Sequence, residues 1–100
     1  MYRGEEEAFR EVLLLFQEGA PSRLELLKTA LVQEDLPAAA RAAHGLANLL
    51  GALRNYEGVG AARATERALN EGNLAAAKVS ASICEEEVET VLQRTKEELS

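Results

Sequence analysis

The chain has 100 residues, a formal net charge of −6 and an apolar fraction of 47%, which fits one domain with a simple core. Nucleic-acid binding is excluded because Lys and Arg form no cluster, and a membrane span is excluded because no apolar run approaches ~20 residues. Cys84 is alone, so the sequence holds neither a disulfide framework nor a metal-ligand pattern. We expect a single, monomeric, cytoplasmic domain over residues 1–100, without signal peptide, metal or cofactor and without contact to nucleic acid or membrane.

Two helices are predicted before Leu36. Apolar residues at helical spacing indicate a helix from about Glu5 to Glu18, and Gly19 is expected to end it. A second helix is predicted to begin near Pro21 and to end near Asp35. The apolar residues that indicate these helices are Phe9, Val12, Leu13 and Phe16 in the first and Leu24, Leu27, Leu31 and Val32 in the second.

The third predicted helix carries His44, the only histidine of the chain. Asp35 is its expected N-cap, with Pro37 just inside, and the stretch from Leu36 to Tyr56 holds no carboxylate. His44 lies roughly 135° from the centre of the apolar stripe of this helix, so the ring should face water. The residues of that stripe are Leu36, Ala39, Ala43, Leu46, Leu50 and Leu53.

Two further helices complete the predicted fold. One runs from about Tyr56 to Asn70 and is closed by Gly72. The last has buried-type residues in alternating steps of three and four, namely Leu74, Ala77, Ala81, Cys84, Val88, Val91 and Thr95. Because short connections make neighbouring helices antiparallel, the expected fold class is all-α, an antiparallel up-and-down four-helix bundle with an additional N-terminal helix.

An exposed neutral imidazole on a helix cleared of negative charge is suited to accept a phosphoryl group. The chain holds no second histidine, and the sequence around His44 offers no carboxylate, serine or metal-binding set that would build an active site. The chain is therefore expected to carry a group rather than to catalyse its transfer. The neighbours on the flank of His44 are too small to shield the ring from another protein: Ala40, Ala47 and Gly51.

The segment from Asp35 to Asn73 resembles the histidine phosphotransfer (HPt) domain of multistep two-component signalling, without gaps. The positions that match the family pattern are Asp35, Ala43, His44, Leu46, Gly51, Leu53, Glu66, Ala68 and Gly72. The positions that depart from it are Ala47 for the usual Lys, Asn48 and Arg54 for Gly, Thr65 for Leu and Asn73 for Asp. Glu66 is interpreted as a surface or bundle-supporting carboxylate without chemistry.

The resemblance implies that His44 accepts a phosphoryl group from a receiver-domain aspartate and passes it on in a phosphorelay. The partner would be the receiver domain of a response regulator or of a hybrid histidine kinase, and this partner would supply the aspartate, its Mg²⁺ and most of the catalysis. The domain itself would be a phosphoryl carrier and not an enzyme. The sequence leaves open whether the chain is free-standing or part of a hybrid kinase.

Because Ala47 stands where the family usually has Lys, other residues near His44 are expected to contact the phosphoryl group. Arg41, one turn before the histidine, is the expected source of positive charge, and the Asn48 amide one turn after it can donate a hydrogen bond to a phosphate oxygen. Arg41 and Ala47 are both expected to be exposed. The surface expected to dock the receiver includes Ala40, Ala47 and Gly51. The alternative is a degenerate HPt-like interaction module that docks receiver domains without being phosphorylated.

Overall fold

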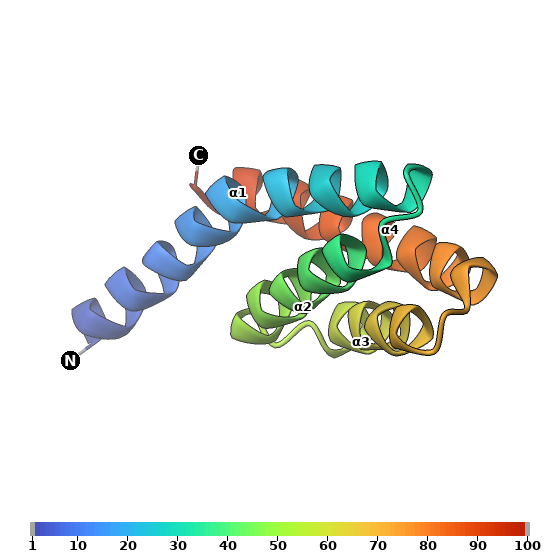
Figure 1. The fold of residues 1–100 in the computed structure, drawn as a ribbon. Helices are drawn as coiled ribbons and strands as arrows, with labels where there is room; N and C mark the ends of the chain where they lie inside the picture. The colour runs from blue at the N-terminus through green and yellow to red at the C-terminus, as the bar shows by residue number, and fades with distance from the viewer. Residues whose placement is uncertain (1, 100) are drawn as a thin grey trace.

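The computed structural model describes residues 2–99, with side chains for residues 6–99, and this part contains four α-helices and no strand. In chain order they are α1 (Tyr2–Val32), α2 (Leu36–Ala52), α3 (Tyr56–Asn70) and α4 (Leu74–Leu99). Consecutive helices pack side by side, α1 also packs against α4, and α2 and α4 lie diagonally opposite (Figure 1). The expectation of an all-α, up-and-down helical bundle is therefore confirmed.

The expectation of a separate N-terminal helix is wrong, because α1 continues through Gly19 and Pro21 without a break. The buried positions explain this: they keep one helical phase through the expected boundary, at Leu13, Phe16, Ala20, Leu24, Leu27 and Leu31. Gly19 has a packing role instead, since a Cβ atom there would lie 3.3 Å from Cδ1 of Leu49. Glycine at this position lets α2 approach α1 closely.

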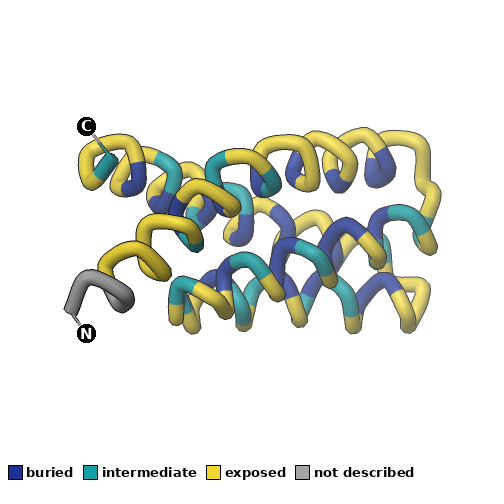
Figure 2. The backbone as a smooth tube through the Cα atoms, turned by 90° about the vertical axis from the view of Figure 1, so that its left-hand side faces the viewer, coloured by how far each residue is buried: buried dark blue, intermediate teal, exposed yellow. Residues whose placement is uncertain are grey.

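Pro21 lies inside α1 on its exposed side. Proline lacks the N–H that would bond to the carbonyl of Gln17, and its ring crowds that turn, which bends a helix. Figure 1 shows α1 changing direction along its length, so that its first turns diverge from the bundle. Residues 6–11 are all exposed, as the yellow stretch next to the N-terminus in Figure 2 shows.

The core lies between the four helices, as the inward-facing dark blue segments in Figure 2 show. Its largest fully buried side chains include Phe16 and Leu27 of α1, Leu46 and Leu50 of α2 and Val88 of α4. Cys84 is buried among them, and burial raises the pKa of its thiol to about 11. The thiol therefore stays neutral and acts as a small apolar core residue.

Three connections of the same design join the helices. In each, the middle residue adopts a positive φ, at Glu34 (56°), Arg54 (57°) and Gly72 (74°). The third residue of each donates its backbone N–H to the carbonyl five residues back, with N–O distances of 2.9 Å from Asp35 to Ala30, 3.0 Å from Asn55 to Leu50 and 2.8 Å from Asn73 to Ala68. The positive φ and this backbone hydrogen bond together define a Schellman turn, which satisfies carbonyl groups at a helix end.

The third residue of each connection also caps the next helix with its side chain. The Oδ1 atoms of Asp35, Asn55 and Asn73 accept from the backbone N–H three residues on, at 3.2, 2.8 and 3.1 Å respectively. The expected N-cap at Asp35 is therefore confirmed. Asn73 makes the same capping bond, so this departure from the family's Asp keeps the turn intact.

Gly58 and Gly60 on α3 should respond oppositely to the same substitution. A Cβ atom at Gly58 would lie 3.0 Å from both methyl groups of the buried Leu50, whereas one at Gly60 would meet nothing within 4 Å. We expect Gly58→Ala to lower the free energy of unfolding by about 1–2 kcal/mol through overpacking. Gly60→Ala should raise it by about 0.5–1 kcal/mol through helix propensity. Urea denaturation of both variants checks this, and equal effects would contradict the packing of α3 on α2.

Candidate functional site

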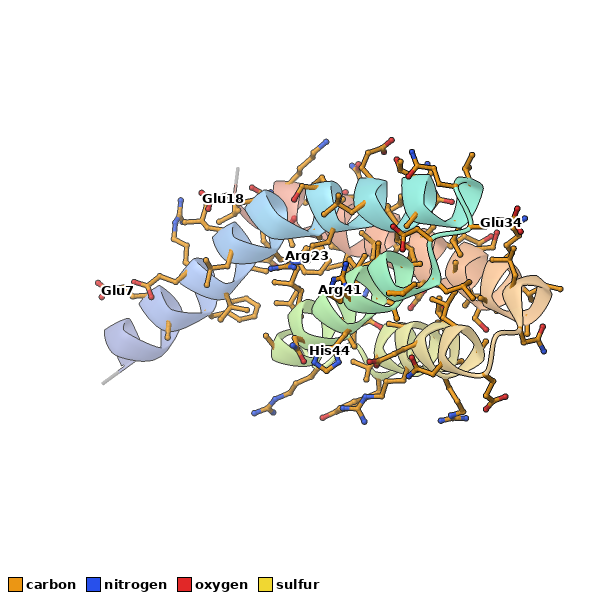
Figure 3. All side chains as sticks on the ribbon, in the orientation of Figure 1. Glu7, Glu18, Arg23, Glu34, Arg41 and His44 are labelled. Atoms are coloured by element: carbon orange, nitrogen blue, oxygen red, sulfur yellow. The ribbon has the colours of Figure 1, made fainter. Side chains whose placement is uncertain are left out.

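His44 stands near the middle of α2 on the side opposite the core, and 62% of its side chain is exposed. The α2 residues on the opposite side are completely buried at Ala39, Ala43, Leu46 and Leu50. The expectation that the ring faces water is therefore confirmed. Figure 3 shows the imidazole at the edge of α2, beside α3.

A carboxylate from α3 contacts the ring. Nδ1 of His44 lies 3.2 Å from Oε2 and 3.4 Å from Oε1 of Glu66, a side chain that is 30% exposed. The sequence interpretation, in which no carboxylate lies near His44 and Glu66 has no chemistry at the ring, is wrong on the first point. A carboxylate accepts a hydrogen bond from Nδ1–H, which leaves the lone pair on Nε2. No other side chain among the described residues bonds to this ring.

An open groove of about 570 Å³ runs between α2 and α3 at His44. It is lined by His44, Ala47 and Asn48 from α2, by Arg63, Glu66, Arg67 and Asn70 from α3, and by Glu71. Neither arginine forms an ion pair or side-chain hydrogen bond within the described part of the chain. The groove therefore offers a nucleophilic nitrogen, two guanidinium groups and two amides to a bound anion.

The structure brings only part of the sequence-predicted site together. Asn48 lines the groove beside His44. Arg41 is exposed, as expected, but it lines a separate hollow with Arg23 and Leu26 on the α1 side of α2. Figure 3 shows Arg41 and Arg23 on this side and His44 on the side away from α1. The expected role of Arg41 beside the phosphate stays a prediction.

The small residues around His44 differ in how accessible they are. Gly51 is exposed and Ala40 is partly buried. Ala47 is only 6% exposed, so the expectation that it faces water is wrong. The reason is that α3 packs against this flank of α2, with Ala47 at the floor of the groove.

The groove side chains that the sequence does not predict come from α3 and from Glu71, the residue that follows it. Arg63 and Arg67 carry no motif of their own, and only the position of Glu66 in the family pattern could have drawn attention to this helix. Which face of α3 meets His44 depends on the packing of α2 on α3, which periodicity within one helix does not specify. Among the described residues, no group of His, Cys, Asp and Glu could hold a metal ion.

A family model described as Hpt domain matches residues 11–98. No curated protein and no solved structure matches the chain. Within residues 2–99, none of the helices combines the length and the apolar character needed to cross a membrane.

Proposed function

Because the chain belongs to the Hpt domain family, whose members serve in histidine phosphotransfer in phosphorelays, we propose that His44 is the phosphoacceptor. It takes a phosphoryl group from the aspartate of a receiver domain and passes it on in a two-component phosphorelay. The observation that carries this proposal is the exposed His44 ring, held through Nδ1 by Glu66 with Nε2 unbonded. The chain acts as a phosphoryl carrier, and the receiver supplies the catalysis.

The proposed transfer step uses the free Nε2 atom of His44. The Nε2 lone pair attacks the phosphorus of the aspartyl phosphate, the P–O bond to the aspartate breaks, and the carboxylate leaves with the bonding electrons. The ring, which keeps its Nδ1–H, becomes positively charged as the Nε2–P bond forms. The Glu66 carboxylate accepts the hydrogen bond that Nδ1–H donates and stabilises that positive charge. Transfer onward to a second receiver reverses these steps.

Removal of the Glu66 carboxylate should slow the transfer. We expect Glu66→Ala to reduce the rate of phosphoryl transfer to His44 about fivefold, which corresponds to roughly 1 kcal/mol for a half-exposed charged hydrogen bond. Glu66→Gln keeps an oxygen that accepts a hydrogen bond from Nδ1–H, so its transfer rate should lie between those of the parent and Glu66→Ala. The ¹⁵N NMR spectrum of the ring should show Nδ1–H in the parent and a mixture of tautomers in Glu66→Ala. Unchanged rates and tautomers in both variants would contradict the role of Glu66.

The receiver is proposed to dock over the groove and the adjoining surface of α2, which includes Ala40, Ala47 and Gly51. Small residues permit the close approach that brings an aspartyl phosphate to a side chain fixed on a rigid helix. Gly51 is exposed two turns after His44 and can meet the partner directly. Ala47, at the floor of the groove, leaves room for the phosphoryl group.

The proposal is tested by phosphoryl transfer from a purified receiver domain charged with acetyl phosphate. We expect phosphate on the chain that is labile in acid and stable in base, as a phosphoramidate bond requires. Coupling between ³¹P and the ring nitrogen in ¹⁵N-labelled protein should assign the bond to Nε2. The absence of such phosphate with every receiver domain tested would contradict the proposal.

The second candidate is an interaction module that docks receivers without being phosphorylated. It is favoured by one observation, that Ala47 and Asn48 contribute no positive charge to the groove from α2. This candidate predicts that titration calorimetry detects binding of the receiver and that no phosphate is found on His44. The two candidates therefore differ in one measured quantity, the amount of phosphohistidine formed.

A further inference from the structure

The groove beside His44 has an asymmetric distribution of charge. Arg63 and Arg67 are four residues apart and therefore lie on one face of α3, and both line the groove. Both are exposed, and neither has a partner carboxylate in the part of the chain that the structure describes. Two guanidinium groups are therefore available to a ligand on the α3 side of His44.

The α2 side of the groove carries no positively charged side chain. Arg41 is the one charged residue of α2, and it lines the hollow on the other side of that helix with Arg23. The α2 residues that line the groove with His44 are Ala47 and Asn48, which are neutral. The cationic side chains that this chain places in the groove are therefore Arg63 and Arg67, both from α3.

We infer that Arg63 and Arg67 bind the phosphoryl oxygens on His44, so that α3 supplies the positive charge that α2 lacks. This inference rests on the proposed phosphorylation of His44. The transferred group brings close to two negative charges, and arginine forms charge-assisted, often bidentate hydrogen bonds to phosphate. Glu66 remains on Nδ1, on the far side of the ring from the Nε2–P bond. Glu71 is the other carboxylate in the groove and opposes the bound charge.

The test uses phosphoramidate, a small anionic donor that phosphorylates histidine without a receiver. We expect the double variant Arg63→Gln/Arg67→Gln to be phosphorylated about tenfold more slowly than the parent, and each single variant about threefold. The dependence of the rate on salt should flatten in the double variant, because screening acts on these charges. Glu71→Gln should change the rate in the opposite direction. Arg94→Gln, on α4, is the matched control for the loss of one exposed arginine.

A direct readout accompanies the rates. On phosphorylation of the parent, the Nε–Hε NMR signals of Arg63 and Arg67 should shift, and that of Arg94 should not. The inference is overturned if the parent is phosphorylated and these two signals stay in place, or if Arg41→Ala slows the reaction more than the α3 double variant. Failure of the parent to form phosphohistidine with either phosphoramidate or a charged receiver would contradict the proposed function itself. The two failures are therefore distinguishable.

Discussion

His44→Gln is expected to abolish phosphoryl transfer to the chain. Glutamine has a similar polarity and an amide that can still contact Glu66, but its nitrogen has no nucleophilic lone pair, so no P–N bond can form. The side chain is 62% exposed and is not part of the core, so the free energy of unfolding should change by less than about 0.5 kcal/mol. The effect on function is therefore complete while the effect on stability is small.

The measurement is incorporation of label from a phosphorylated receiver into the parent and the variant at equal concentrations. Denaturation curves of both proteins provide the control for folding. Asn48→Ala is a comparison within the same groove, because it removes the amide expected to bond to a phosphate oxygen but leaves the nucleophile in place, so this variant should still take up label. Label in His44→Gln at the level of the parent would place the acceptor on another residue.

Gly51→Phe is expected to block transfer from a receiver while the chain stays folded. Gly51 is exposed on α2, and a Cβ atom there would lie 3.8 Å from Cγ2 of Val59, an ordinary contact distance. A phenyl ring can therefore extend outward without disturbing the core, and the bulk occupies space that the partner needs. We expect transfer from the receiver to fall by at least about a hundredfold, equivalent to roughly 3 kcal/mol of lost docking energy.

Phosphoramidate separates docking from chemistry in this variant. A small donor does not need the surface at Gly51, so phosphorylation of His44 by phosphoramidate should continue at the rate of the parent. Gly51→Ala is the matched control and should transfer normally. If Gly51→Phe accepts phosphate from the receiver as fast as the parent does, the receiver docks on a different face of the chain.

The sequence predicts most of the fold because the helices follow simple periodic rules. The middle of the predicted α2 stripe, from Ala39 to Leu50, is buried as its spacing indicates, and its end residues Leu36 and Leu53 are partly buried. The predicted limits of the helix from Tyr56 to Asn70 agree with α3. The connections are predictable for a local reason, since Asp35 and Gly72 satisfy backbone groups within a few residues of themselves. Burial on one helix face and capping of a helix end depend on residues that are close in the sequence, so both can be predicted from the sequence.

The sequence predicts one helix too many, because two local boundary signals interrupt a buried pattern that is continuous in the structure. Gly19 and Pro21 are typical of helix boundaries, yet the buried phase that includes Phe16, Ala20 and Leu24 passes through them. Packing of this stripe against α2 and α4 outweighs the roughly 3 kcal/mol that an interior proline can cost, and the exposed position of Pro21 lets the helix bend.

The site was predictable only on the helix that carries the histidine. The exposure of His44 follows from its angle to the stripe of α2. Its contact with Glu66, the burial of Ala47 and the place of Arg63 in the groove all depend on how α3 is rotated about its axis against α2. That rotation is set by interlocking side chains of two helices, such as Gly58 against Leu50, and no single-helix pattern contains it.

The three Schellman turns bear on how quickly a partner can bind. Each connection fixes its helix end with backbone bonds of 2.8–3.0 Å and starts the next helix with a side-chain cap. Sliding or rotating one helix against the next would break the backbone hydrogen bonds of the turn and the side-chain cap. The two helices that form the groove are therefore preorganised. Association with a receiver should then be a single bimolecular step, whose rate rises in proportion to receiver concentration without reaching a plateau set by a slow opening of the bundle.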